Sequence, residues 1–490
     1  MTQRPRFHEA CTKIVATVGP ACDQVPELVA LIEAGVDVFR INSAHGSQQQ
    51  HAEKLANIRI ASEQTGFPVG VLLDLAGPKI RLGNLKLDPL PCHFAQEVTF
   101  VRGESPANDY ELTSSYDRLV DELDVGDCVM LADGTVALEV IKATKDRATC
   151  RVTAGGEVRS RQGINLPGVR LSVSAMLPSD FENAIWAAKN GIDFISLSFV
   201  RSAEDVRSLK ALLTTYESAA LVIAKIEKPE ALDDLERIVR VADGVMVARG
   251  DLGVEIDVAE TPVAQKRIIQ VCKQQMKPVI VATQMLESMH HSRRPTRAEA
   301  SDVANAVLDG ADACMLSGET AIGDFPVDAV ATMNRIMRKT EQRLLGGLLP
   351  PELLADSGGD ERPGSAAQRV REVTLAVTEG ATSIAEAIGS KLIVVATHSG
   401  NTAWVKSNSR SLIPTLAISD HDESVRRMNL FWGIKPMGLP RIEETSQLIE
   451  HVCRWGTDQG GLTPGDNVVI VTGSGVMHKA HNMLLVHTVE

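Results

Sequence analysis

Charged, amide and hydroxyl side chains stand at the ends of short apolar runs along most of the chain. Two of the carboxylates, Glu227 and Asp251, suit Mg²⁺, a hard ion that takes few protein oxygens and completes its shell with substrate and water. Arg40 and Lys225 suit the oxygens of a transferring phosphoryl group, where catalysis is mostly positioning and charge stabilisation. The other members of the set are Asn42, Asp74, Lys79, Arg81, Ser196, Ser198, Arg249, Thr283, Gln284, Ser317 and Glu319.

The apolar runs that carry these residues predict an α/β protein built on a (β/α)8 TIM barrel. Barrel active sites lie at the carboxyl ends of the strands, so the polar set would gather there. Each polar residue taken singly is more simply a solvated loop residue, and a barrel alone fixes no function. Polar pairs at seven of eight strand ends favour a metal-assisted enzyme acting on an anion. The eight strands are expected to begin near Ile14, Val36, Val69, Ile192, Leu221, Gly244, Pro278 and Ala313.

The remaining segments predict further domains. Residues 84–172 alternate apolar and polar side chains and contain the hairpin signal Asp133-Gly134, which indicates an inserted small β-barrel acting as a lid. Residues 1–83 and 173–345 would form the catalytic barrel. Residues 346–366 are rich in Gly, Pro and Asp and predict a linker. Residues 367–490 then predict a C-terminal α/β regulatory domain with an open sheet.

The composition of the chain excludes several classes of binding partner and of structural cross-link. A net charge of −13, from 63 acidic and 50 basic residues, argues against nucleic-acid binding and against a polybasic membrane contact. The eight cysteines form no C-x-x-C pair, so neither a disulfide framework nor a zinc site is indicated. No apolar run approaches the length of a membrane span, and no signal peptide is recognisable. We expect a cytoplasmic protein.

Eight ordered segments of the chain closely resemble the pyruvate kinase family. They are TKIVATVGP, FRINSAHG, LLDLAGPKIRLG, IAKIEKPEAL, DGVMVARGDLGVEI, PVIVATQMLESM, RRPTRAEASDVANAVLDGADACMLSGETAIGDFP and VVATHSGNTA. The resemblance implies phosphoryl transfer from phosphoenolpyruvate to ADP in glycolysis, giving pyruvate and ATP. It also implies a requirement for Mg²⁺ or Mn²⁺, allosteric control and a homotetramer.

The resemblance also implies roles for individual residues. Glu227 and Asp251 would hold the divalent cation, Lys225 would stabilise the transferring phosphoryl group and the enolate, and Arg40 would contact the phosphate. The phosphoenolpyruvate carboxylate would lie against Gly250, Asp251 and Thr283, and proton delivery would involve Thr283 and water near Glu319. The nucleotide is expected near His45, Arg81 and Arg161, although His45 is almost equally well explained as a structural histidine.

Two departures from the family pattern concern the monovalent cation. Lys79 stands where many members have a Glu that accompanies K⁺, and Ala44 replaces a serine whose hydroxyl resembles a K⁺ ligand. Members with Lys at this place are typically independent of K⁺, so we expect the same here. Asn42 and Asp74 would then hydrogen-bond Lys79. The alternative is that Lys79 points to solvent.

Other departures concern the nucleotide and an effector. Gln162 replaces a nucleotide-facing lysine, for which the adjacent Arg161 is a substitute. After a predicted strand, the segment from Thr397 to Thr402 offers hydroxyls and amides for a phosphate, so a phosphorylated effector is expected at Thr397, Ser399, Gly400 and Thr402. A hydroxyl-capped turn is the equally good alternative.

Two rival functions remain open at this point. One is a catalytically weak metabolite sensor, and the other is a Mg²⁺-dependent barrel lyase acting on pyruvate or oxaloacetate. Neither would form pyruvate from phosphoenolpyruvate in an ADP-dependent reaction, so one assay separates all three.

Overall fold

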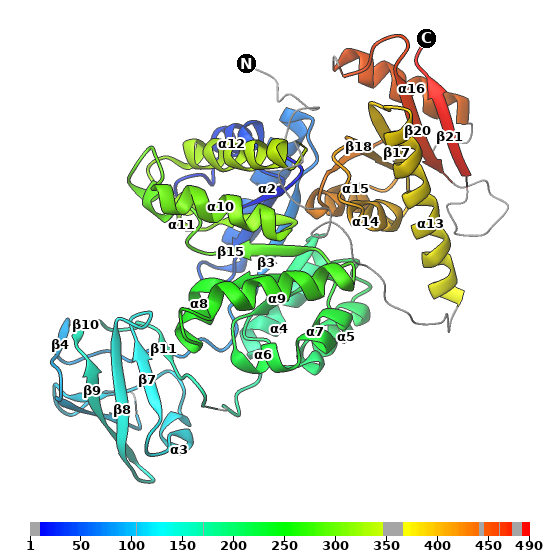
Figure 1. Cartoon of the computed structure of the whole chain (residues 1–490). Coiled ribbons are helices and arrows are strands. Elements are labelled where there is room, and N and C mark those ends of the chain that lie inside the picture. Colours follow the sequence, from blue (N-terminus) through cyan, green and yellow to red (C-terminus); the bar gives the residue numbers. More distant parts are fainter. Residues whose placement is uncertain are drawn as a thin grey trace.

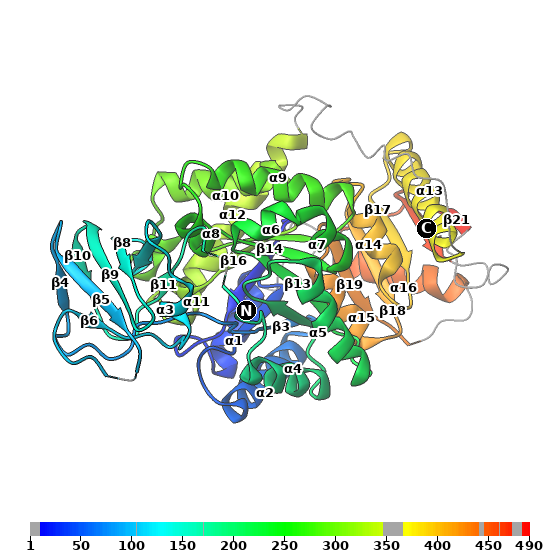
Figure 2. The same ribbon diagram turned by 90° about the horizontal axis from the view of Figure 1, so that it is seen from below.

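A computed structural model describes residues 10–103, 105–169, 171–345, 366–440, 445–459, 461–472 and 483–490. A β-rich part, a central barrel and an α/β part lie in a row (Figure 1; Figure 2). The predicted linker, residues 346–366, lies outside the described residues except for its last position. The described residues include no helix long and apolar enough to cross a membrane.

The central part is a closed barrel of eight parallel strands, as predicted. The strands are β1 (Lys13–Thr17), β2 (Val38–Asn42), β3 (Gly70–Asp74), β12 (Phe194–Leu197), β13 (Leu221–Ile226), β14 (Gly244–Ala248), β15 (Val279–Ala282) and β16 (Ala313–Leu316). Each begins within two residues of its expected position. Buried on both faces, the strands are nearly continuous apolar runs, which is typical of parallel sheets covered by helices.

Helices surround the barrel and return the chain to the start of each next strand. They are α1 (Val25–Ala34), α2 (Gln48–Thr65), α4 (Pro178–Lys189), α5 (Ala203–Thr215), α6 (Pro229–Asp233), α7 (Leu235–Val241), α8 (Arg249–Glu255), α9 (Thr261–Gln274), the 3₁₀ turn η1 (Glu287–His290), α10 (Arg297–Asp309), α11 (Gly318–Ala321) and α12 (Pro326–Leu345). Local sequence signals determine where several of these helices begin and end. Thr296 caps α10 through a reciprocal contact with Glu299, and Gly310 ends that helix at a φ of 98°.

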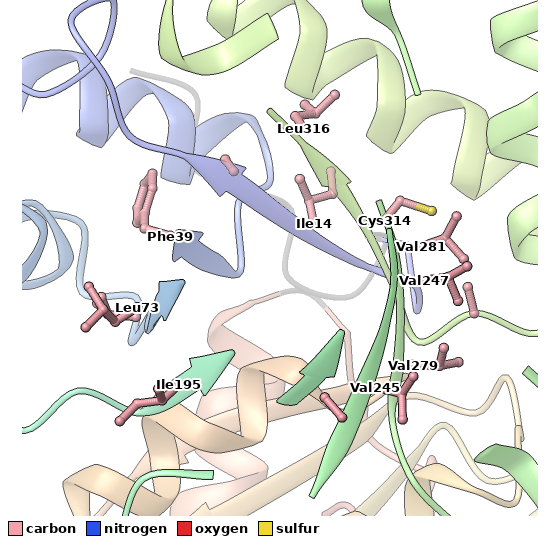
Figure 3. Packing of buried hydrophobic residues seen from close by; sticks show 14 of the residues in the cluster. Ile14, Phe39, Leu73, Ile195, Val245, Val247, Val279, Val281, Cys314 and Leu316 are labelled. Atoms are coloured by element: carbon pink, nitrogen blue, oxygen red, sulfur yellow. The ribbon is translucent and has the colours of Figure 1, made fainter. Parts of the chain in front are cut away.

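Alternate strand residues serve two different cores. Ile14, Ile195 and Val281 face outward and pack with the surrounding helices in one large cluster (Figure 3). Val15 and Phe194 face the barrel interior and belong to a second cluster. This second cluster continues into the C-terminal part, so the base of the barrel shares its core with that part.

Four buried or half-buried aspartates fasten the starts of alternate barrel strands. Each precedes a strand, and one of its carboxylate oxygens accepts the backbone N–H of a residue on the preceding strand at 2.9 Å. In return, each aspartate donates its own backbone N–H to the carbonyl of that same residue. We call each arrangement an aspartate clip. The pairs are Asp37 with Ile14, Asp193 with Val71, Asp243 with Val222 and Asp312 with Val279.

The inserted segment forms mostly antiparallel sheet, with β5 and β6 paired in parallel, and has a core of its own built around Phe100 and Leu138. A six-stranded sheet has the order β11-β7-β8-β9-β5-β6, and β10 pairs with β4. The predicted turn at Asp133-Gly134 joins β7 to β8 with positive φ at both residues. The elements are β4 (Leu90–Cys92), β5 (Glu97–Val101), β6 (Glu111–Leu112), α3 (Leu119–Glu122), β7 (Cys128–Leu131), β8 (Val136–Ala143), β9 (Arg147–Ala154), β10 (Gly156–Val158) and β11 (Ile164–Asn165).

The C-terminal part is an α/β domain whose open sheet has the order β19-β18-β17-β20-β21, with β21 antiparallel. Met428 and Phe431 complete the interior core at the base of the barrel, and Arg426 pairs with Asp193 at 2.8 Å. The elements are α13 (Ala366–Ala387), β17 (Leu392–Ala396), α14 (Asn401–Ser407), β18 (Thr415–Ser419), α15 (Asp422–Arg427), η3 (Met428–Leu430), β19 (Ile434–Gly438), α16 (Thr445–Asp458), β20 (Asn467–Thr472) and β21 (Met483–Thr488).

Candidate active site

Lys225 is the centre of a buried ionic network at the carboxyl ends of the barrel strands. Its side chain is 12% exposed, and Nζ lies 2.9 Å from Glu227 Oε1 and 3.3 Å from Asp74 Oδ1. Nζ also donates to Ser198 Oγ at 2.8 Å. Burial lowers the pKa of Lys225, but the two carboxylates outweigh burial and the net direction is upward. The ammonium therefore stays charged and fixed in direction.

Asp74, at the end of β3, joins Lys225 to Arg40. Arg40 donates from Nε and Nη2 to Asp74 Oδ2 at 2.9 and 2.6 Å, and Ser196 Oγ donates to Oδ1 at 2.6 Å. Burial alone would raise the pKa of Asp74, but Lys225 and Arg40 lower it overall. The ionised carboxylate holds both cations at one edge of the barrel, which is the predicted position for Arg40 and Lys225.

Glu227 and Asp251 were predicted to hold a divalent cation, and their environment fits one. Glu227 is 1% exposed, and its Oε2 accepts the backbone N–H of Phe199 at 2.7 Å. Burial raises the pKa of Glu227, and the neighbouring Asp251 carboxylate raises it further against the influence of Lys225. Two neighbouring carboxylates, of which Glu227 is buried, form a donor set that a hard divalent ion would stabilise.

Lys79 lies against Asp251 instead of the partners expected from the sequence. Its Nζ is 3.1 Å from Asp251 Oδ1, and its side chain is one-third exposed. Asp74 is engaged by Arg40 and Lys225, and Asn42 Oδ1 accepts the backbone N–H of Ala44. The difference arises because buried Asp74 already has two cations, whereas Asp251 stands at the open cleft. The ammonium is thus beside the predicted metal ligand.

A strained backbone segment places Thr283 and Gly250 together. Thr283 and Gln284 follow β15 with φ of 70° and 55°, a region that branched residues rarely adopt. Thr283 Oγ1 accepts the Gly250 backbone N–H at 2.7 Å. Arg249 stabilises the turn by donating to the Thr283 carbonyl, and it pairs with Asp302 at 2.7 Å. The hydroxyl and the start of α8 are therefore held at one point of the cleft.

Glu319 lies beside two residues that the sequence analysis did not single out. It is 1% exposed and accepts the backbone N–H groups of Leu286 and Ser317. One potential metal-ligand atom from each of Glu287, His290 and Glu319 lies within 4.8 Å of the other two. His290 Nε2 is buried and has no hydrogen-bond partner. A Cβ at position 318 would come 2.3 Å from that nitrogen, so the glycine there makes room for the imidazole. The adjacent His290-His291 pair is a weak signal in sequence.

A cleft of about 1000 Å³ opens beside these residues, between the barrel mouth and the inserted domain. Lys79, Asp251, Thr283 and His290 line it, and Asp133 contributes from the inserted domain. The inserted domain contacts the barrel where Asn165 Nδ2 donates to Glu255 Oε1 at 3.0 Å. This arrangement suits a domain that covers the mouth.

The residues predicted to contact nucleotide are less closely gathered. Arg81 Nη1 donates to the Arg161 carbonyl at 3.2 Å, so these two lie together where residues 1–83 meet the inserted domain. His45 is exposed, and its carbonyl accepts from His51. None of these three described residues is among those that line the cleft.

The predicted effector segment lies far from the barrel mouth, at the carboxyl end of β17. Thr397 and Thr402 are buried, Ser399 is exposed, and Gly400 precedes α14 with a φ of 84°. Thr397 Oγ1 is buried without a hydrogen-bond partner. The structure brings the four residues onto one turn, as their order along the chain requires.

The fold and site define a barrel phosphotransferase, and comparisons with known proteins identify its family. Residues 9–330 match the pyruvate kinase barrel domain and residues 375–487 match the pyruvate kinase alpha/beta domain. The chain belongs to the pyruvate kinase family. It is 40% identical over 462 residues to the pyruvate kinase of Mycobacterium intracellulare, covering 94% of each chain. It is 37% identical over 487 residues to that of Geobacillus stearothermophilus, covering 98% of this chain and 80% of the relative.

A solved structure agrees with the sequence comparisons. The crystal structure of a pyruvate kinase from Cryptosporidium parvum superposes with a TM-score of 0.90 at 33% identity. The match covers 100% of this chain and 98% of that one. The inserted and C-terminal domains therefore belong to the shared fold together with the barrel.

Proposed function

We propose that this chain transfers the phosphoryl group of phosphoenolpyruvate to ADP, forming pyruvate and ATP, with Mg²⁺ or Mn²⁺ as the divalent cation. The observation that carries the proposal is the Lys225 ammonium, which two buried carboxylates hold at the barrel mouth beside Arg40. A fixed, desolvated cation costs no reorganisation when charge develops on the transferring group.

The surrounding residues would take the roles that the family resemblance implies. Arg40 and Lys225 would neutralise phosphoryl oxygens, and Asp74 keeps both oriented. Gly250 and Thr283 would meet the substrate carboxylate, and proton delivery would involve the Thr283 hydroxyl and water near Glu319. Glu227 and Asp251 would hold the divalent ion, which supplies further charge stabilisation. Closure by the inserted domain would exclude water and limit hydrolysis of the substrate.

Replacing Lys225 by Met tests the proposal. We expect kcat for ADP-dependent pyruvate formation to fall by about 10²–10³-fold or more, because a preorganised charge is lost. Lys142→Met, at an exposed lysine of β8, is the matched control and should leave kcat unchanged. Near-normal kcat in the Lys225 variant would remove this residue from the mechanism. Pyruvate formation without ADP would favour a lyase, and no turnover by the native chain would favour a metabolite sensor.

We further propose that the enzyme does not require K⁺. The Lys79 side chain lies at the cleft with Nζ 3.1 Å from Asp251, and Ala44 lacks the hydroxyl of the family pattern. A monovalent cation bound beside Lys79 would be repelled by the Lys79 ammonium.

Activity in tetramethylammonium chloride, compared with KCl at equal ionic strength, measures this property. Equal rates are expected for the native chain, and more than tenfold stimulation by K⁺ would refute the proposal. Lys79→Glu should lose activity in tetramethylammonium and regain part of it in K⁺, whereas Lys142→Glu should respond to neither salt.

The proposal also includes a cytoplasmic homotetramer regulated by a phosphorylated metabolite, preferably a monophosphate. The Thr397 hydroxyl is buried without a hydrogen-bond partner, which favours the binding of a ligand on the turn that includes Ser399, Gly400 and Thr402. All eight cysteines are free thiols, as a reducing compartment favours. Light scattering and a thermal-shift screen of phosphorylated metabolites, with Thr397→Val as the comparison, test assembly and effector separately.

A further inference from the structure

Two histidines and an aspartate come together at the carboxyl edge of the C-terminal sheet. His398 follows β17, and Asp420 and His421 follow the neighbouring parallel strand β18. His398 Nδ1 lies 2.9 Å from Asp420 Oδ1, and the two imidazole rings have centroids 4.0 Å apart. One potential ligand atom from each residue lies within 4.8 Å of the other two.

Backbone contacts hold the two loops that carry these side chains. Ser419 Oγ donates to the His398 carbonyl at 3.1 Å and accepts the backbone N–H of His421 at 3.2 Å. One hydroxyl thus ties both loops together and holds the backbone positions that carry the two imidazoles. Preorganisation of this kind lowers the cost of binding.

The charge around the cluster favours a cation. Asp422 and Glu423 occupy the first turn of α15 directly after His421. The Asp420 carboxylate itself lies beside both imidazoles, with Oδ1 2.9 Å from His398 Nδ1. Arg426, on the same helix, is paired with Asp193 of the barrel instead of facing the cluster.

We propose that His398, Asp420 and His421 form a binding site for a first-row divalent transition-metal ion such as Zn²⁺. Imidazole nitrogen and carboxylate oxygen are ligands that Zn²⁺ accepts, with water completing the shell, whereas Mg²⁺ prefers oxygen ligands alone. The site is separate from Glu227 and Asp251. It lies next to the turn proposed for an effector phosphate, and uses other side chains of the same sheet edge.

Titration calorimetry of the full chain with Zn²⁺, in excess Mg²⁺ to occupy the catalytic site, tests this proposal. We expect His398→Asn and His421→Asn each to weaken Zn²⁺ binding at least tenfold, because each removes one ligand. His451→Asn, at an exposed histidine on α16, is the matched control and should bind Zn²⁺ as the native chain does. Unchanged affinity in both ligand variants would overturn the proposal.

Two further measurements separate this site from others. Zn²⁺ should raise the thermal unfolding midpoint of the native chain but not that of the His398 and His421 variants, whose metal-free midpoints should match the native one. Co²⁺ should give visible absorption bands that are lost in the same two variants. If the bands disappear in His290→Asn instead, the ion lies in the barrel cleft and the proposal is wrong.

Discussion

Two buried lysines in this chain show how surroundings decide the charge of one side-chain type. Lys225 has two carboxylates within 3.3 Å, which hold its ammonium charged. Lys406, on α14, is 2% exposed, and its Nζ donates to Ser409 Oγ at 2.7 Å. Burial lowers the pKa of Lys406 to about 8, and the Glu386 carboxylate opposes this lowering only in part. The first lysine is held charged by its partners, and the second lowers stability at neutral pH.

This difference predicts a pH dependence of stability that originates in Lys406. Between about pH 8 and 10.5 the unfolded chain binds more protons at this residue than the native chain, so the contribution of Lys406 to stability rises with pH over that interval. Lys406→Met should stabilise the protein at pH 7 by about 1–3 kcal/mol and remove this contribution from the pH profile. Ser409 Oγ keeps its bond to the Lys406 carbonyl in the variant.

Thermal unfolding of both proteins from pH 7 to 10.5 measures the effect. Lys142→Met is the control for loss of an exposed lysine, and it should keep the native pH profile. Parallel profiles for the Lys406 variant and the native chain would contradict the assignment.

At the scale of elements, the four aspartate clips secure strands that have few residues. Barrel strands here have four to six residues, so each contributes few ladder hydrogen bonds. A clip adds a charged acceptor at the start of the pair, and a basic side chain balances each carboxylate. The bases are Lys13 for Asp37, Arg59 and Arg426 for Asp193, Lys210 for Asp243, and Arg410 for Asp312.

Removing one clip should therefore destabilise the barrel substantially. Asp193→Asn leaves Arg59 and Arg426 without their shared carboxylate, and we expect a loss of about 3–5 kcal/mol, as for other buried pairs deprived of one partner. Asp233→Asn, at an exposed aspartate of α6, should change stability by less than about 0.5 kcal/mol. Guanidinium unfolding of both variants distinguishes the two expectations, and equal midpoints would refute the role given to the clip.

Sequence periodicity predicted the elements well because each strand–helix unit carries its own local signals. It also predicted that Lys225, Glu227 and Arg40 would meet, since parallel strands end at the same rim. It did not predict the partner of Lys79, which depends on the competition for Asp74 among three cations. The cluster of His398 with Asp420 and His421 was missed for a related reason, because its members are joined only by the pairing of β17 with β18.

At the scale of the whole molecule, the two added domains stand in different relations to the barrel. The inserted domain has a separate core and reaches the barrel mouth through polar contacts such as Asn165 to Glu255. The C-terminal domain shares the interior core of the barrel base through Met428 and Phe431. Figure 2 shows the two at opposite ends of the barrel. One lines the cleft through Asp133, and the other completes the core at the base of the barrel.

This contrast predicts different outcomes when each domain is removed. A chain ending at residue 345 would expose apolar side chains such as Val38 and Phe194, so we expect ANS binding, aggregation and a lower unfolding midpoint. A chain in which a short Gly-Ser linker replaces residues 84–172 should keep a cooperative thermal transition but lose kinase activity. A stable, ANS-negative protein after C-terminal removal would show that the shared core is dispensable.

The aspartate clips have a consequence for how this chain can be cut. Each clip joins two neighbouring strands within one pair, and the pairs are β1 with β2, β3 with β12, β13 with β14, and β15 with β16. A break at the exposed loop residue Glu217 falls between the second and third pairs. Two fragments made there would each retain two complete clips. The barrel can thus be divided into two halves, each held by its own two aspartate clips. This makes the loop a suitable place to split the chain for reporters or to open it for circular permutation.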